Sequence, residues 1–145
     1  DGYDGYVYMN IVEVLREMDS DFSVGCLAAA LVKTNIIRKL EEKCQSPIEL
    51  KLYRSLQRAG LDQWLELQYE IPEAHTRLDF AYPDKKLAIY CDGHDYHERT
   101  KEQAKRDRGQ DRALQALGWK VLRYTGSEIH HDVERVVTEI TKFLG

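Results

Sequence analysis

The chain has 145 residues, 43% of them hydrophobic and 32% charged, and its formal net charge is −4. This length suits one domain with a buried core, and no apolar run approaches the ~20 residues of a membrane-spanning helix, so we expect a globular protein that does not enter a membrane. Cys26, Cys44 and Cys91 lack the short paired spacing of a zinc site or a disulfide framework, which favours a reducing, cytoplasmic setting.

The first 45 residues carry helical patterns and no chemical motif. Val7 to Met18 and Val24 to Lys43 both place apolar residues at helical spacing, in the second case at Val24, Leu27 and Leu31. We predict two helices here. An amphipathic helix usually buries its apolar stripe, so we expect elements that pack on the domain or dock a partner.

A third helix should start at Ser46 and end near Gly60. Ser46 suits the N-cap, Pro47 suits the first turn, and Glu49 completes a capping box three residues after Ser46. Three strands should follow, at 65–71, 77–82 and 86–91, the last two joined by a turn at Pro83-Asp84. The first of them alternates as Leu65, Leu67, Tyr69 and Ile71.

The remaining pattern completes the fold class. A long charged helix is predicted at 98–117 and ends at Gly118, followed by a strand at 119–124 and a terminal helix at 132–144. This order predicts a layered α/β or α+β domain over residues 46–145, with a mixed sheet of about four strands flanked by helices. Residues 1–45 are predicted to be an N-terminal helical extension with two extra helices.

Two carboxylates occupy neighbouring positions of the predicted hairpin. With the turn at 83–86, Asp79 lies opposite Tyr90, and Asp92 is its diagonal neighbour at about 7 to 8 Å. Alternation puts Asp79, Tyr90 and Asp92 together on one face. The opposite face, toward the core, receives Leu78, Phe80, Leu87, Ile89 and Cys91.

A pair of acids on one surface favours a bound cation. Like charges repel, and a hard ion such as Mg²⁺ suits a few carboxylates plus water, so Asp79 and Asp92 are candidate ligands. The alternative is a strand-ending turn at Asp92-Gly93, with Asp79 as a solvated strand residue.

Two histidines follow directly, in Gly93-His94-Asp95-Tyr96-His97. A histidine beside a metal can take a proton from water near neutral pH, although either histidine can equally be a hydrogen-bonded loop residue. Tyr96 can stack on or wedge a base, or simply pack.

An inward-facing acid lies on the long charged helix. Asp107 shares a helical stripe with Ala104 and Leu114, which turns it toward the packed side. Paired with His97, it would orient the imidazole and stabilise its protonated form. The alternative is a salt bridge to Arg77 or Arg123.

Basic residues are concentrated around these candidates. From Thr76 to Thr125 there are 11 Lys and Arg against 8 Asp and Glu, a local charge of +3, so the rest of the chain carries −7. Clustered cations bind the phosphate backbone, whereas the overall charge alone would argue against nucleic acid. We expect backbone contacts from one helix, with a solvated helix face as the alternative, at Lys101, Lys105, Arg106, Arg108 and Arg112.

The ordered combination resembles the very short patch repair endonucleases and the EDxHD homing endonucleases, a branch of the PD-(D/E)xK restriction-endonuclease-like superfamily. The resemblance runs from about Ser46 to Ile129. It is carried by Glu49, Arg77-Leu78-Asp79-Phe80, Ala88-Ile89-Tyr90-Cys91-Asp92-Gly93, His97, Arg106-Asp107-Arg108 and Leu114 through Leu122 with its Gly118-Trp119 pair.

The resemblance implies a Mg²⁺-dependent DNA endonuclease, with Mn²⁺ as a substitute, that nicks or cuts both strands in repair, homing or restriction. It implies that Asp79 is the principal metal ligand and that Cys91 offers its backbone carbonyl. His97 would activate the water and Asp107 would orient His97. Glu49 would contact the metal or its water, and its capping role explains it equally well.

Three departures from the family pattern shape the remaining expectations. Asp92 stands where the repair enzymes carry a histidine, and we expect an acid there to ligate metal instead. Tyr90 stands where many relatives carry Glu, so a catalytically inactive DNA-binding module is the alternative, and a nuclease for RNA on the same fold is a third possibility. His94 and Arg99 occupy the places where repair enzymes hold zinc, so we expect no structural zinc.

The expected partner is therefore DNA and not a membrane. A homodimer, or fusion to a further domain, is compatible with the unassigned first 45 residues.

Overall fold

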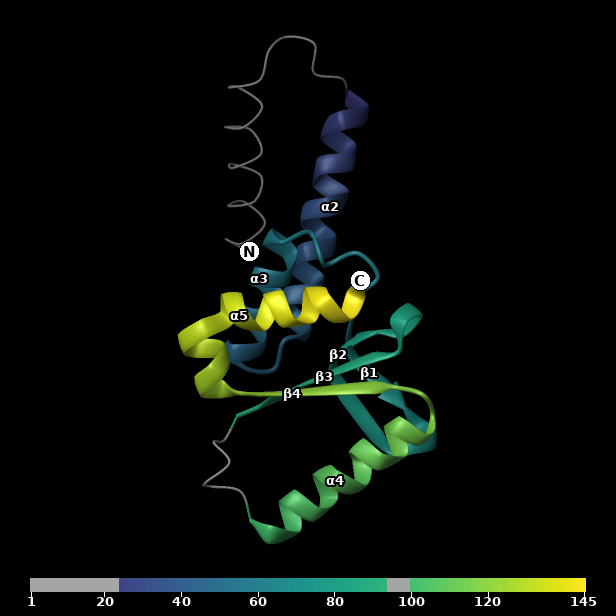
Figure 1. The fold of residues 1–145 in the computed structure, drawn as a ribbon. Coiled ribbons are helices and arrows are strands. Elements are labelled where there is room, and N and C mark those ends of the chain that lie inside the picture. The colour runs from purple at the N-terminus through teal and green to yellow at the C-terminus, as the bar shows by residue number, and fades with distance from the viewer. Residues whose placement is uncertain (1–23, 94–99) are drawn as a thin grey trace. The chain divides into compact units, whose positions relative to one another are not determined.

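The computed structural model describes residues 24–93 and 100–145 (Figure 1). The chain divides into two units between Glu42 and Lys43, and the described residues of each are treated separately. Helix α2 spans Val24–Lys43, as predicted, while the helix predicted at Val7 to Met18 lies outside the described residues. None of the described helices combines the length and the apolar character needed to cross a membrane.

The second unit alternates helices and strands in the predicted order. Its elements are α3 (Pro47–Arg58), β1 (Glu66–Ile71), β2 (Thr76–Tyr82), β3 (Leu87–Asp92), α4 (Lys101–Ala116), β4 (Lys120–Thr125) and α5 (Gly126–Leu144). Two single 3₁₀ turns, η1 (Pro72–Ala74) and η2 (Pro83–Lys85), connect β1 to β2 and β2 to β3. Each begins with proline and is closed by a left-handed residue, His75 (φ 51°) or Lys86 (φ 49°).

The four strands form one mixed sheet in the order β1-β2-β3-β4. The first two pairings are antiparallel, and β3 runs parallel to β4 through the α4 crossover. Phe80 pairs with Ile89, which places Asp79 opposite Tyr90 and confirms the predicted register. The predicted fold class, a mixed sheet flanked by helices, is confirmed.

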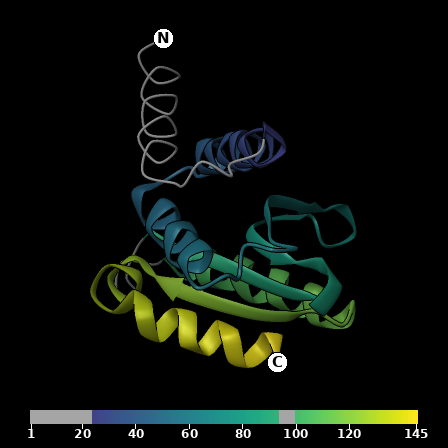
Figure 2. The same cartoon turned by 90° about the horizontal axis from the view of Figure 1, so that it is seen from above.

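Helices cover both faces of this sheet. Figures 1 and 2 show α3 and α5 on one side and α4 on the other. The side chains of Leu52, Tyr53 and Leu56 on α3 are fully buried, as are Ile129 and Val136 on α5. Opposite them, a cluster forms between α4 and the sheet from Ile71, Ala74, Leu78, Ala81, Ala88, Tyr90 and Leu114.

The prediction that Asp79, Tyr90 and Asp92 share a polar face opposite the core is therefore wrong. Tyr90 is only 7% exposed and belongs to the cluster beneath α4. The reason is topological: a parallel β3–β4 pair needs a crossover, and the crossover helix covers the face that alternation alone would leave to solvent. Consecutive residues of β3, from Leu87 to Tyr90, are therefore all buried.

Strands β1 and β2 also depart from simple alternation at one shared level. Leu78 and Ala81 are three residues apart yet lie in the same cluster, although such positions in a regular strand point to opposite faces. Gln68 has a left-handed backbone (φ 52°), and the flanking pairs Leu67↔Phe80 and Tyr69↔Leu78 place it opposite Asp79. The faces of both strands therefore change at Gln68 and Asp79.

Helix α5 begins six residues before the predicted start. Thr125 caps it through a capping box with Glu128, and a kink follows at Asp132 (φ −148°, ψ 54°). Asp132 then acts as a second cap, since its Oδ1 accepts a hydrogen bond from the Arg135 N–H at 3.3 Å. The predicted helix is the part after this kink.

Candidate active site

Residues from α3, β2 and β3 meet at the carboxyl end of β3. Helix α3 contributes Glu49. Ser46 caps this helix by accepting a hydrogen bond from the Glu49 N–H at 3.3 Å, as predicted. The Glu49 side chain accepts from the backbone N–H of Gln45, one residue before the N–H that a capping box would use. The predicted capping box is therefore only half formed, and Glu49, which is only 5% exposed, is held by Gln45 instead of Ser46.

Asp79 lies on β2, and its side chain accepts a backbone hydrogen bond from β3 where the regular pairing of the two strands has ended. The ladder between β2 and β3 reaches as far as the pair Phe80↔Ile89. Beyond it, the N–H of Cys91 donates to Asp79 Oδ2 at 2.8 Å. The carboxylate is thereby fixed between the two strands, on the side where Glu49 lies rather than beside Tyr90.

The two acids influence each other electrostatically. Burial raises the pKa of Asp79 from 3.8 to about 7, helped by hydrogen bonding to Glu49 and by the charges of Glu49 and Asp92, while the Cys91 N–H lowers it. A carboxyl with this pKa is short of positive charge around it. The arrangement suits a bound cation, which would replace the proton.

Cys91 contributes through its backbone. Burial and the nearby charges of Asp79 and Glu49 raise the pKa of the Cys91 thiol well above its ordinary value. The thiol therefore stays protonated and is a poor metal ligand, since metals bind the thiolate. Its predicted carbonyl contact with a metal stays a prediction.

Arg123, on β4, is surrounded by a second cluster of acids. Its Nε lies 3.1 Å from both carboxylate oxygens of Asp111 and its Nη2 lies 2.7 Å from Oδ1. Its guanidinium carbon lies 4.0 Å from the centre of the Tyr90 ring, the residue that pairs with it across β3 and β4. The side chain is 11% exposed, so this cation is held in place on several sides.

Two predicted site residues join this second cluster. Arg123 Nη1 lies 3.4 Å from Asp92 Oδ1 and 3.9 Å from Asp107 Oδ1. Asp107 therefore adopts the alternative that its sequence position left open, a salt bridge to Arg123. Its predicted pairing with His97 is not described, because His94, Tyr96 and His97 lie outside the described residues.

The basic residues predicted to contact DNA lie on the outer face of α4. Lys101, Lys105, Arg108 and Arg112 follow each other at helical spacing and are exposed, and Arg106 is exposed beside them. None of the five has an ion-pair partner within the described parts of the chain. Asp107 and Asp111 occupy the inner stripe, so these two acids lie on the opposite side of α4 from the exposed cations.

Gln68, Asp111 and Arg123 were not found as site residues from the sequence. Asp111 and Asp107 are four residues apart on one helix, a spacing that indicates a shared face. Arg123 was considered only as a salt-bridge partner. No sequence pattern around Gln68 predicts its left-handed backbone, because its neighbours form an ordinary strand sequence.

The donors at this site fit some cations better than others. Across residues 24–93 and 100–145, no group of three His, Cys, Asp or Glu side chains has the arrangement of a metal cage. Mg²⁺ commonly binds through one or two carboxylates and completes its shell with water and substrate phosphate oxygens. The Asp79–Glu49 pair, made only of hard oxygen donors, fits that mode.

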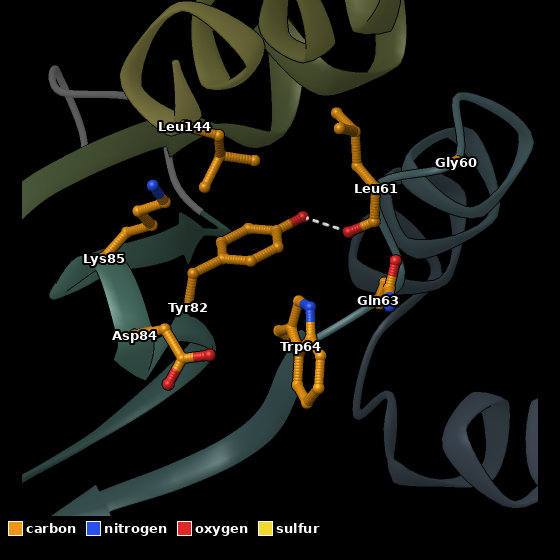
Figure 3. Close-up of a pocket in the computed structure, with 8 residues that line it drawn as sticks. All are labelled: Gly60, Leu61, Gln63, Trp64, Tyr82, Asp84, Lys85 and Leu144. Atoms are coloured by element: carbon orange, nitrogen blue, oxygen red, sulfur yellow. Dashed lines mark hydrogen bonds between the residues drawn. The ribbon is translucent and has the colours of Figure 1, made fainter.

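A separate pocket of about 450 Å³ opens beside η2, at the other end of β3 (Figure 3). Leu61, Trp64 and Leu144 surround Tyr82, whose hydroxyl donates to the Leu61 carbonyl at 2.6 Å. Asp84 is the only acid among its lining residues. It offers no paired carboxylates, so the acids at the carboxyl end of β3 are the better candidate for chemistry.

Comparison with known families places this site in context. The model of the REase_MTES_1575 family, which is restriction endonuclease-like, matches residues 49–144. The chain belongs to this restriction endonuclease-like family. The family match begins at Glu49 and contains every residue of both acidic clusters, so the superfamily part of the resemblance seen in the sequence is confirmed.

Two individual proteins are also similar to this chain. An uncharacterized protein of Haemophilus influenzae is 30% identical over 102 residues, which are 69% of this chain and 80% of that protein. Among solved structures, the catalytic domain of the homing endonuclease I-Bth0305I matches with a TM-score of 0.54 and 23% identity. That match covers 68% of this chain and 94% of the domain, and it shows a shared restriction endonuclease-like fold.

Proposed function

We propose that this protein is a Mg²⁺-dependent endonuclease that hydrolyses phosphodiester bonds of DNA, in the branch of the very short patch repair and EDxHD homing enzymes. The observation that carries this proposal is the pairing of half-buried Asp79 with buried Glu49 at the carboxyl end of β3, in which the pKa of Asp79 is raised to about 7. Membership of a restriction endonuclease-like family and the likeness to a homing endonuclease domain support it.

Asp79 and Glu49 are the proposed metal ligands, and Mn²⁺ should substitute for Mg²⁺. The cation, when bound, supplies polarisation of the phosphate and stabilises charge on the leaving oxygen. The chain's own part is orientation. The Cys91 N–H fixes one oxygen of Asp79, and the Gln45 N–H fixes one oxygen of Glu49, which leaves defined lone pairs for a ligand.

Three further residues complete the proposed site. His97 is the proposed general base that takes a proton from the attacking water. Asp107 is its proposed orienting partner, and Asp92 is a proposed additional ligand. Both acids lie next to Arg123, whose positive charge keeps the carboxylates together despite their mutual repulsion.

The exposed cations of α4 are the proposed DNA contacts. They lie on the solvent side of the helix that carries Asp107 on its inner side, so they would hold a DNA backbone along the outer face of α4. Phosphate contacts of this kind position the duplex without reading its sequence.

Plasmid cleavage tests the proposal. Supercoiled plasmid incubated with the protein and Mg²⁺ should be nicked or linearised, and Asp79→Ala should abolish this while DNA binding in a gel-shift assay is kept. Asp84→Ala, in the η2 turn beside the separate pocket, is the matched control and should cut like wild type. Equal lack of cleavage by wild type and Asp79→Ala, with binding intact, would overturn the enzymatic proposal. A single-stranded RNA substrate in parallel separates DNA from RNA cleavage.

A second candidate function is a DNA-binding module without activity. It is favoured by Tyr90, which stands where the resemblance to the wider superfamily would lead one to expect Glu. The Tyr90 hydroxyl lies 2.6 Å from the Thr76 hydroxyl and its ring lies against Arg123, so the position is filled by packing. Binding without cleavage in the same plasmid assay is the outcome that selects this function.

A further inference from the structure

We propose that Gln68 is a positioning residue of the metal site, holding Glu49 through its amide N–H and a metal-bound water through its amide oxygen. This inference rests on the proposed function above, and it extends the site to a strand, β1, that contributes none of the predicted site residues. It is carried by three observations at one residue: its backbone, its hydrogen bond to Glu49 and its buried oxygen.

The backbone of Gln68 is unusual for its location. Among the described residues, four that are not glycine have a positive φ: Trp64, Gln68, His75 and Lys86. His75 and Lys86 close 3₁₀ turns and Trp64 precedes β1, where such a conformation reverses or redirects the chain. Gln68 alone of these lies inside a strand, where a side chain on a left-handed backbone is disfavoured.

The position of this backbone is tied to the site. By the flanking register Gln68 stands opposite Asp79, and the ladder between β1 and β2 skips this one pair. The change of face at this level removes Asp79 from the α4 side and leaves it beside Glu49. A strained residue directly across from the principal acid is the pattern expected where a site, rather than the strand, sets the conformation.

The side chain of Gln68 reaches the second acid. Its Nε2 donates to Glu49 Oε1 at 3.4 Å, while the other oxygen of Glu49 accepts from the Gln45 N–H. An ionised carboxylate only accepts hydrogen bonds, so the amide nitrogen must face Glu49. The orientation of the amide follows, and the amide oxygen is turned away from Glu49.

That amide oxygen is buried and has no hydrogen-bond partner within the described residues. Buried acceptors of this kind are normally satisfied by protein or by ordered water. The charged groups around it, Glu49 and Asp79, are acceptors as well when ionised. A water bound to a cation is a strong donor, and it would satisfy the Gln68 oxygen while the cation satisfies the two carboxylates.

The decisive experiment separates backbone strain from metal positioning. Gln68→Gly removes the amide and also relieves the left-handed backbone, so the variant should fold at least as well as wild type. His75→Gly is the matched control, because it relieves the same conformation at an exposed turn away from the acids. Gln68→Met, which keeps the length of the side chain without the amide, gives the same measurement if the glycine variant does not fold.

The readout is Mn²⁺ affinity of the full chain without DNA, from the loss of the free-ion electron paramagnetic resonance signal, with thermal melts in EDTA alongside. We expect Gln68→Gly and Gln68→Met to bind Mn²⁺ about 10- to 100-fold more weakly than wild type, the range for groups that orient metal ligands. His75→Gly should bind like wild type, and Gln68→Gly should melt no lower than wild type in EDTA.

Either of two results would overturn the inference. Mn²⁺ affinity of Gln68→Met and Gln68→Gly within twofold of wild type would show that Gln68 only shapes the strand. If wild type cuts DNA with Mg²⁺ while these variants bind Mn²⁺ as wild type does, this inference fails and the proposed function stands. Failure of wild type to bind Mn²⁺ or to cut removes the proposed function together with it.

Discussion

The carboxylate of Asp79 accepts a hydrogen bond at 2.8 Å from the backbone N–H of Cys91, at the point where strands β2 and β3 stop pairing. A side chain thus completes the sheet where the ladder ends. This bond gives the acid a fixed direction, but it compensates only part of the cost of burying a charge next to Glu49. Stability and function at this residue should therefore oppose each other.

Asp79→Asn should stabilise the metal-free protein at alkaline pH. The pKa of Asp79 is raised from 3.8 to about 7 in the folded state, so the folded protein holds a proton that the unfolded chain releases. The free energy of unfolding of wild type therefore falls as pH rises from about 4 to 7, and it stays at the lower value above pH 7. Asparagine has no such penalty and can still accept from Cys91, so the gain should be on the order of a few kcal/mol.

Thermal melts of wild type and Asp79→Asn in EDTA check this expectation at pH 5 and pH 8. The advantage of the variant should be larger at pH 8. A difference in Tm that does not change between the two values would show that Asp79 titrates normally.

Arg123→Met should destabilise the fold. It leaves Asp92, Asp107 and Asp111 beside one another without their shared cation. Because these side chains are only partly buried, the loss should be about 1 to 3 kcal/mol, below the cost of breaking a fully buried ion pair. Arg123→Lys should recover only part of this, because lysine cannot form the two-point contact with Asp111. Urea denaturation measures both. Adding Asp111→Asn to Arg123→Met should cost less than the two single changes together, and strict additivity would argue against coupling.

Neutralising the outer face of α4 should weaken DNA binding without unfolding the protein. Replacing Lys101, Lys105, Arg108 and Arg112 with glutamine should flatten the plot of log affinity against log salt by about 0.9 for each phosphate that the variant no longer neutralises. Fluorescence anisotropy with a labelled duplex at several salt concentrations measures the slope. Lys142→Gln, exposed near the end of α5, is the control, and an unchanged slope in the quadruple variant would assign the DNA contacts elsewhere.

His97→Ala should slow cleavage about 100- to 10,000-fold, the usual contribution of a positioned general base. DNA affinity and the concentration of Mg²⁺ needed for half-maximal rate should stay close to wild type, because His97 is not a proposed ligand. Single-turnover cleavage measures the rate. His94→Ala is the neighbouring control, and if it lost activity instead, the base would be His94.

Much of the fold was accessible from the sequence because it depends on near neighbours. The Ser46-Pro47 start of α3, the turn at Pro83 and the Gly118 end of α4 are local signals, and these features lie close to their predicted positions. The opposition of Asp79 and Tyr90 followed from the turn alone, since a turn fixes the register of both strands.

The partners of the candidate acids were decided only by tertiary structure. Alternation grouped Asp79 with Tyr90, but α4 buries Tyr90 on one face, and the backbone at Gln68 and Asp79 turns the acid toward Glu49 on the other. Likewise, Arg123 gathers Asp92 and Asp107 from two separate elements. A periodic pattern records which residues share a side of one strand or helix. Which side is covered, and by which charge, depends on how distant segments pack, and that information is not contained in any local stretch of the chain.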